Sequence, residues 1–232
     1  MMRLRTAWLL LSLLGIALAA HAGDVVSMPT GNVVQPNHAE FNYIFWNLEK
    51  VGNVRDHAHV YELFVGAAQN LEVDLLHVDL QGIDKFTEVN AYYTLQPETP
   101  AKPSLVLGVT NLFGSDWLPS EDRPFKPGDY TGDDRLSPFV LGAYNLRAPQ
   151  DGPPTPKDPL IRAHLGLGFN YHEDRLFGAV QCLLTPQWGA GIFNYRGDPA
   201  YLAVYKPKPE WEVRAGWFGG DPLVSVGYSY AR

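Results

Sequence analysis

Charged residues that alternate with apolar ones in extended segments are the residues of this chain best placed to do chemistry. Successive side chains of a strand point to opposite faces, so charges two positions apart share one face. On this basis the polar faces carry eight ionisable residues: Glu62, Glu72, Asp74, Glu88, Arg162, His164, Glu212 and Arg214. Charges on an inward face imply contact with water or pairing with one another, because an unpaired buried charge is costly.

Two interpretations of these eight residues stay open. They could form a structural network of salt bridges and hydrogen bonds that fills the interior of a small barrel. They could instead form a constriction that selects passing solutes by charge.

Two segments offer oxygen or nitrogen ligands to a metal ion, and neither is complete. Acidic side chains crowd residues 113–137, but the segment contains no Asp-x-Asp-x-Asp-Gly calcium loop. His57 and His59 have a spacing that would place both on one strand face, but no third ligand can be named. We therefore expect neither a metal ion nor another cofactor.

Alternation with a period of two marks the elements that would position the charges. Residues 162–170 (RAHLGLGFN) and 224–230 (VSVGYSY) place apolar side chains on one face and polar or small ones on the other. Such strands separate an apolar environment from a polar one.

The same alternation, with turn residues between the segments, predicts the strands of the whole chain. Twelve extended segments result, at 38–48, 59–67, 70–80, 86–95, 104–112, 138–146, 160–170, 175–185, 188–195, 200–206, 211–218 and 223–231. Most are close to the roughly 9 to 11 residues with which a tilted strand crosses a bilayer. We predict an all-β protein, an antiparallel transmembrane β-barrel of about twelve strands. Residues 38–48 carry bulky side chains on both faces, so their orientation stays open.

The composition agrees with a single β domain. The 232 residues include 22 glycines and 19 prolines, and the net charge is −7. No cluster of lysine and arginine indicates nucleic acid as a partner. The single cysteine, Cys182, excludes an intramolecular disulfide and alternates in phase with apolar neighbours, which predicts a small apolar filler.

The N-terminus has the features of a secretory signal. Residues 1–22 have a basic start, an apolar run and a small-residue close at Ala20-His21-Ala22. The run is shorter than the about 20 residues of a membrane-spanning helix. We expect cleavage near Ala22, which leaves residues 23–232 as one barrel domain with a lead-in at 24–37 that plugs or lines one mouth.

Aromatic residues near the ends of apolar stripes predict contact with lipid. Four form the expected aromatic girdle: Trp211, Trp217, Tyr228 and Tyr230. Tryptophan and tyrosine concentrate at the two interfaces of a bilayer. Membrane lipid is therefore an expected partner.

The signal peptide, residues 28–34 (MPTGNVV) before an aromatic strand, and the ending GYSY at 227–230 resemble outer-membrane β-barrel proteins of Gram-negative bacteria. This resemblance implies a place in the bacterial outer membrane, a porin-like structural or narrow-pore role, and recognition by the barrel-assembly machinery. The aromatic residue that this machinery recognises is usually the last one, whereas Tyr230 is followed by Ala231 and Arg232.

Residues 29–31 (PTG), 108–111 (GVTN) and 139–142 (FVLG) also resemble segments of YjbH-type barrels, whose members are generally larger. That resemblance implies a part in exopolysaccharide export or cell-envelope maintenance, with a polysaccharide or small solutes as partners. It carries no catalytic signature.

Two other classes of function stay open. In a secreted, soluble, lipocalin-like barrel the apolar stripes would line a ligand cavity and the charged faces would meet water; alternation alone fits both arrangements.

A lipid-modifying outer-membrane enzyme would pair a serine with a histidine. His164 is the histidine that lies well inside a clean strand, but no serine can be assigned to it and residues 108–112 and 142–146 hold no Gly-x-Ser-x-Gly turn. We name no catalytic residue and expect the chain not to be an enzyme.

Overall fold

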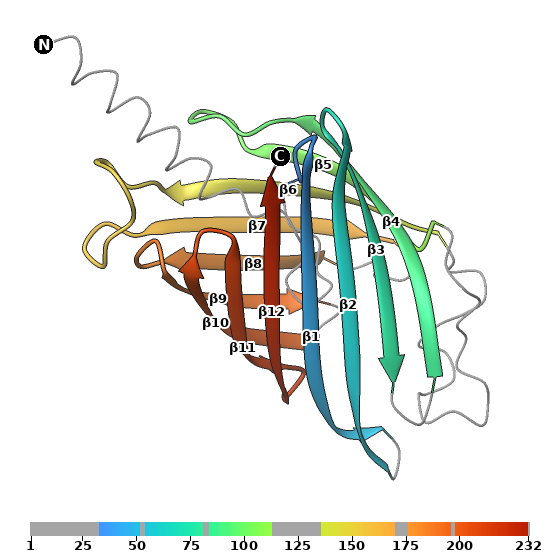
Figure 1. The fold of residues 1–232 in the computed structure, drawn as a ribbon. Coiled ribbons are helices and arrows are strands. Elements are labelled where there is room, and N and C mark those ends of the chain that lie inside the picture. The colour runs from blue at the N-terminus through green and yellow to red at the C-terminus, as the bar shows by residue number, and fades with distance from the viewer. Residues whose placement is uncertain are drawn as a thin grey trace, which may run out of the picture.

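Twelve antiparallel strands close into one barrel, as the sequence predicts (Figure 1). The computed structural model describes residues 33–51, 54–80, 84–112, 136–169, 176–195 and 198–231. The strands are β1 (His38–Val51), β2 (Val54–Ala68), β3 (Leu71–Leu80), β4 (Asp84–Gln96), β5 (Ser104–Thr110), β6 (Ser137–Arg147), β7 (Leu160–Gly168), β8 (Leu176–Leu183), β9 (Trp188–Tyr195), β10 (Asp198–Lys208), β11 (Trp211–Phe218) and β12 (Asp221–Ala231). Each strand pairs with its neighbours in sequence, and β1 pairs with β12, so the sheet has no open edge.

Three sequence-based expectations fall outside the described residues. They are the signal peptide at 1–22, the first part of the lead-in at 24–32, and most of the acidic segment, at 113–135. Among the residues that the structure describes, no helix is long and apolar enough to cross a membrane.

The observed strands differ from the expected ones mainly at their ends. The sequence predicts a break from 48 to 59, whereas β1 continues to Val51 and β2 begins at Val54. The register of this pair shifts between Leu48 and Val51. Backbone pairing needs only an extended chain, so a strand can continue beyond the point where its side chains stop alternating.

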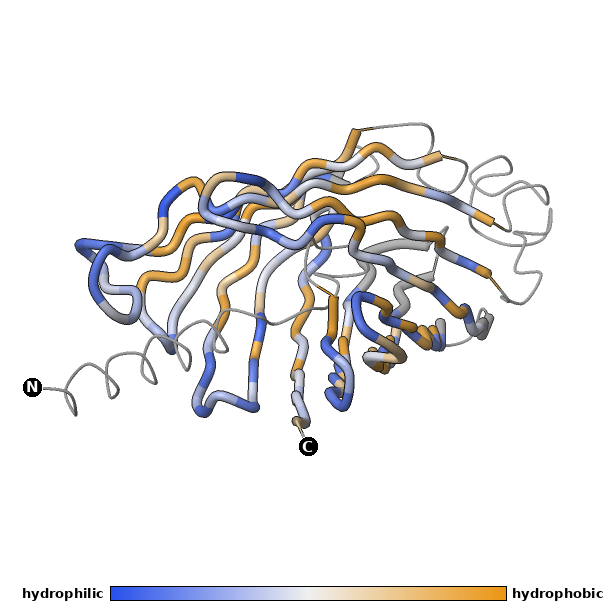
Figure 2. Tube along the Cα trace, turned by 90° about the horizontal axis from the view of Figure 1, so that it is seen from above, coloured by the Kyte–Doolittle hydropathy of each residue, from blue (hydrophilic) through white to orange (hydrophobic). Residues whose placement is uncertain are grey.

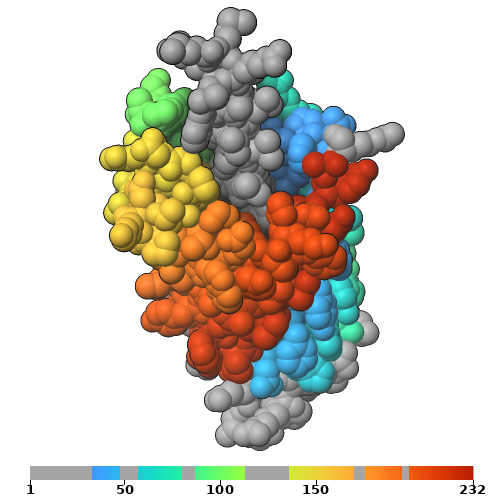
Figure 3. All heavy atoms as spheres, turned by 60° about the vertical axis from the view of Figure 1, so that its left-hand side comes forward, coloured from blue at the N-terminus to red at the C-terminus, as the bar shows by residue number. Residues whose placement is uncertain are grey.

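The two ends of the chain close the barrel. The β1–β12 pairing runs from His38, opposite Ala231, to Trp46, opposite Leu223. In the space-filling view the C-terminal strand, in red, lies beside N-terminal residues in blue (Figure 3). Closure therefore joins the first and last strands of the sequence, and their pairing provides hydrogen-bond partners for the backbone groups that would otherwise form two open edges.

The outer face of the wall is apolar all the way round. Every one of the twelve strands carries at least one exposed large apolar side chain, and Leu165 and Leu176 are 64% and 65% exposed. The alternation is visible as changes of colour along the strands in Figure 2. Burial also orients β1, which the sequence left open, because Phe41 is 44% exposed whereas Ile44 is 1% exposed.

The inner face is less polar than the sequence predicts. The expected polar interior is found only in part, because a large cluster of buried apolar side chains also points inward. Its members are Val33, Ile44, Ala58, Val60, Leu76, Val78, Tyr92, Val106, Phe139, Leu141, Phe177, Ala179, Phe193, Ala200, Leu202 and Leu223. In an interior packed with side chains, an apolar group costs less than a polar group without a partner.

Glycines on neighbouring strands make room for two of the inward aromatic rings. Gly108 on β5 lies opposite Phe139 on β6, and Gly166 on β7 lies opposite Phe177 on β8. A Cβ built at either glycine would overlap the ring opposite it. Phe139 and Phe177 are each 3% exposed, and their rings are 6.0 Å apart in an edge-on arrangement. The ring thus covers the strand backbone that the glycine leaves bare.

The β6–β7 connection, residues 148–159, is rich in proline and is held by its own hydrogen bonds. Arg147 pairs with Asp158 at 3.0 Å, and the backbone N–H of Gln150 donates to the Asp158 carboxylate at 2.7 Å. The Gln150 N–H and the Arg147 guanidinium together hold the pKa of Asp158 below its usual value. This connection is therefore ordered despite its length.

Gly166→Ala is expected to destabilise the barrel by about 1–3 kcal/mol, because the added methyl group must displace the Phe177 ring in a packed interior. Gly142→Ala is the matched control, since a Cβ there would meet its nearest atom at an ordinary 3.7 Å. Denaturant unfolding in detergent micelles would measure both. Phe177→Leu should relieve much of the cost in the double variant; strictly additive effects would contradict the proposed contact.

Candidate functional site

Charged side chains on the inner wall gather toward one end of the barrel. We call the end where β1 begins and β12 finishes the terminal end. Along β1, buried Glu40 and Asn42 come first from this end and Ile44 follows. Along β3, Glu72 comes first and Leu76 follows. Most of the charged side chains of the inner wall therefore lie in the half at the terminal end, the charged half, and apolar side chains predominate beyond it, in the apolar half.

An ion network on β10, β11 and β1 is the most highly charged part of this half. The Arg214 Nε donates to Oε1 of Glu212, and Nζ of Lys206 lies 2.9 Å from Oε2 of Glu212. Arg214 also lies 4.0 Å from Oε1 of Glu40, two strands away. All four residues are at most 9% exposed. Removing one member of such a buried network costs about 3–5 kcal/mol, because its partner is left charged and unpaired.

Small residues on β12 let this network form across the strand that lies between β11 and β1. Gly227 is opposite Glu212, and Ser225 is opposite Arg214. A Cβ built at Gly227 would meet Oδ1 of Asn42 on one side and Cβ of Glu212, at 3.8 Å, on the other. The glycine and serine of the final strand therefore have a packing function on the inner wall.

A second polar group lies on β1 to β4. Nδ2 of Asn90 donates to Oδ2 of Asp74 at 2.7 Å, and Oδ1 of Asn90 accepts from the backbone N–H of Asn111 at 2.8 Å. Nδ2 of Asn42 donates to Oε2 of Glu62 at 3.4 Å. These amides connect neighbouring strands and supply donors to buried carboxylates.

Glu72 and Glu88 complete the acidic residues of this group. Glu72 is 2% exposed and accepts a hydrogen bond from the backbone N–H of Val34. Glu88 is half-buried and lies opposite Leu76.

Arg162 on β7 links the β4–β5 turn to β6 and β7 at the terminal end. Its Nη1 donates to Oε2 of Glu98 and, at 3.1 Å, to Oδ1 of Asn145. The backbone N–H of Asn145 donates to the other Glu98 oxygen at 2.8 Å. One carboxylate, from the β4–β5 turn, therefore joins β6 and β7.

His164 is also on the inner wall, next to Arg162. It is 3% exposed, and its Nε2 lies 3.3 Å from Oε1 of Gln181 on β8. The ring therefore does not lie on the outer face, where the lipid-modifying enzyme would need it to meet a lipid.

All eight ionisable residues singled out in the sequence are thus buried or half-buried on one face of the wall. The structure brings Glu212 and Arg214 into one network and places Arg162 apart from it. Sequence reasoning missed Glu40, Lys206 and Glu98. Glu40 and Lys206 lie in phase with inward neighbours, so alternation could have found them. Glu98 lies in a turn, where no alternation exists.

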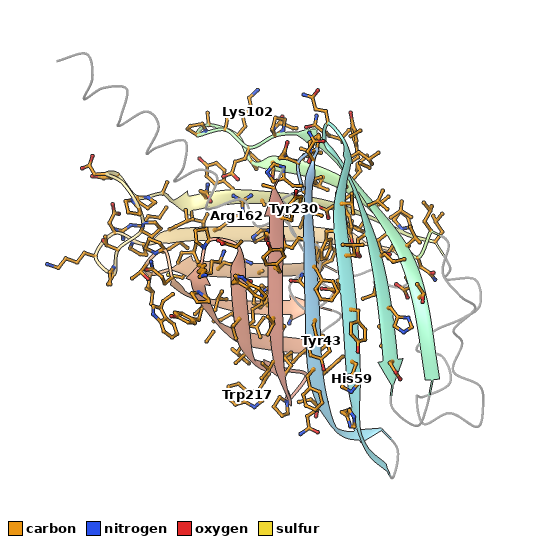
Figure 4. The ribbon with its side chains drawn as sticks, in the orientation of Figure 1. Tyr43, His59, Lys102, Arg162, Trp217 and Tyr230 are labelled. Atoms are coloured by element: carbon orange, nitrogen blue, oxygen red, sulfur yellow. The ribbon has the colours of Figure 1, made fainter. Side chains whose placement is uncertain are left out.

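The four residues of the expected aromatic girdle are all exposed on the outer face. Trp211, Trp217, Tyr228 and Tyr230 are 41%, 56%, 37% and 52% exposed. The rings of Trp211 and Tyr228 pack together with their centroids 4.9 Å apart. Trp217 and Tyr230 lie toward opposite ends of the barrel (Figure 4).

His57 and His59 are also on the outer face, within an aromatic group. The hydroxyl of Tyr43 lies 2.7 Å from Nδ1 of His59 (Figure 4). The rings of His57 and His59 are 5.1 Å apart. Over the described ranges of the chain, no group of three or more His, Cys, Asp or Glu side chains could hold a metal ion.

Known structures share this fold. A KdgM porin matches with a TM-score of 0.52 and 14% identity, over 83% of this chain and 99% of the porin. A KdgM porin in complex with disordered oligogalacturonate matches with a TM-score of 0.50 and 13% identity, over 84% and 99% of the two chains. No protein-family model and no curated protein sequence matches this chain. At these identities the likeness shows the fold alone: this chain is a closed, twelve-stranded antiparallel barrel, similar to those of the two porins.

Proposed function

We propose that this chain is a porin-like barrel of the bacterial outer membrane, and that its interior is a narrow passage for small neutral or cationic solutes. The observation that carries the proposal is that this barrel has apolar side chains outside and charged side chains inside, the reverse of a soluble protein. Large apolar side chains cover the outer face of every strand, while carboxylates and guanidinium groups are buried inside. A closed barrel with an apolar exterior is suited to lipid, because all backbone groups are paired within the sheet.

The same burial disfavours a soluble, lipocalin-like binder. That alternative requires the apolar stripes to line a cavity and the charged stripes to face water. Here Leu165 is 64% exposed and Glu62 on an inner stripe is 1% exposed. An exterior of this kind would leave a large apolar surface in water.

A narrow passage, rather than a wide channel, follows from the packing of the inner wall. Phe64, Leu141 and Val106 are completely buried. Side chains that line a wide, water-filled pore would be reached by solvent. Export of an intact polysaccharide, which the resemblance to YjbH-type barrels implies, would need these side chains to move apart; a small solute needs far less.

The charges on the inner wall set the sign of the preferred solute. Away from the hairpin tips, and with Glu98 of the β4–β5 turn included because it pairs with Arg162, the described inner wall carries seven carboxylates against three cations. The carboxylates are Glu40, Glu62, Glu72, Asp74, Glu88, Glu98 and Glu212, and the cations are Arg162, Lys206 and Arg214. The formal excess is four negative charges. Acidic rings favour cations in pores. We therefore propose that an acidic saccharide, such as the oligogalacturonate bound by the KdgM porin, would be disfavoured in this barrel.

The first test is the location of the processed protein. It should fractionate with the outer membrane and migrate differently in a gel before and after boiling, because a closed barrel resists detergent until it is heated. Recovery from the periplasm as a water-soluble monomer would overturn the proposal.

The second test is ion selectivity in planar bilayers. The unmodified protein should show a small conductance that prefers K⁺ over Cl⁻. Glu212→Gln should lower this preference and Arg214→Gln should raise it, each by roughly twofold, since one charge at about 8 Å in water contributes about 0.5 kcal/mol. The two variants are matched, because they remove opposite charges from adjacent inward positions on β11. An anion preference, a shift of both variants in the same direction, or no conductance at all would contradict the proposed passage.

A further inference from the structure

The segment before β1 runs inside the barrel. Val33 and Val34 are 7% and 6% exposed, and Pro36 forms a parallel bridge with Gly66 of β2. Inward positions of β2 include Glu62 and Phe64, so Gly66, two residues further, also faces inward. We call residues 33–37 the strap.

Gly66 leaves room for the strap because it has no side chain. A Cβ built there would overlap the carbonyl oxygen and carbon of Gln35, which are backbone atoms. Unlike a flexible side chain, a backbone carbonyl cannot rotate away, so any side chain at position 66 would push the strap off the wall. Here the glycine serves close approach of two backbones.

A buried carboxylate and apolar contacts hold the strap in place. The backbone N–H of Val34 donates to Oε2 of Glu72, a charge-assisted hydrogen bond in a protected position. Val34 packs with Phe64, which is 0% exposed, and Val33 joins the main apolar cluster. The contacts come from two strands, β2 and β3.

A tight turn connects the strap to the wall. The backbone N–H of His38 donates to the carbonyl of Gln35 at 3.1 Å, and Asn37 has φ 67°. Asparagine is one of the few residues other than glycine that adopts this left-handed conformation readily. The turn reverses the chain, so that β1 begins at the mouth while the strap lies within it.

We propose that the strap is a built-in constriction of the terminal end, seated on Gly66 and Glu72, and that its release widens the passage. The strap occupies space inside the charged half, beside Glu72. Its seat combines a close backbone contact, which only glycine allows, with one buried polar anchor. The effect on passage rests on the function proposed above, whereas the seating of the strap does not.

Cysteine labelling tests the seating directly. In a Cys182→Ser background, Val34→Cys should react slowly with a water-soluble maleimide in the folded, detergent-solubilised protein, compared with Gln187→Cys in an exposed turn. Adding Gly66→Val should speed labelling at position 34 on the order of tenfold or more, because the strap then opens more often. Adding Gly142→Ala, the control glycine, should leave the rate unchanged.

A milder variant guards against misfolding of Gly66→Val. Glu72→Gln keeps an acceptor for the Val34 N–H but removes the charge, so it should speed labelling by a smaller factor than Glu72→Ala. Each variant must retain the shift on boiling that marks a closed barrel. Two results would contradict the proposed seating of the strap. One is equal labelling rates for Val34→Cys and Gln187→Cys in the Cys182→Ser background. The other is a labelling rate at position 34 that neither Gly66→Val nor the two Glu72 variants change.

Conductance separates the strap from the proposed passage. If the strap is seated as proposed and the passage exists, Gly66→Val conducts more than the unmodified protein. If labelling responds and neither protein conducts, the strap is seated as proposed but the passage fails. If labelling responds and the two proteins conduct equally, the strap does not constrict the lumen, and that part of the inference is wrong.

Discussion

The structure depends above all on closure of the backbone hydrogen-bond network, in which β1 pairs with β12. A sheet that closes on itself has no unpaired edge, so its outer side chains are free to be apolar and its inner ones can be charged. The residues that complete this closure are small on the inside of β12, where Ser225 and Gly227 lie, and aromatic on the outside, where Tyr228 and Tyr230 lie. The final strand, β12, therefore pairs with β1 to close the barrel, leaves room for the inner ion network and contributes to the outer apolar face.

The interior depends on the same closure, because polar groups that the closed wall encloses must find their hydrogen-bond and ion-pair partners among one another. At the terminal end, charges satisfy one another: Glu212 holds Arg214 and Lys206, and Glu98 holds Arg162. Further in, rings and aliphatic side chains pack together, and glycines make room for them. The strap fits this pattern, since its backbone uses a glycine as a seat and a buried carboxylate as an acceptor. In the passage that we propose, the charged half would select by the charge of the solute and the apolar half would limit its size by packing.

The sequence predicts much of this from a single regularity, the alternation of side chains. Alternation located all twelve strands, and it placed residues such as Glu62 and Arg214 on one face of the wall because a strand has only two faces. It could not show the apolar half, since Ile44 and Phe41 are both bulky and apolar and differ only in what surrounds them. Nor could it find Glu98, which reaches Arg162 from a turn 64 residues away in sequence. Gly66 reads as an ordinary strand glycine until the strap is placed against it.

The central claim is that the apolar outer face contacts hydrocarbon. Variants that retain one tryptophan each, Trp217 at 56% exposure on the outer face or Trp46 on the inner face against Phe218, can be reconstituted in liposomes with bromine on the lipid acyl chains. Bromine quenches tryptophan fluorescence only at short range, so the account predicts strong quenching of Trp217 and little of Trp46. Equal quenching of the two, or stronger quenching of Trp46, would contradict it.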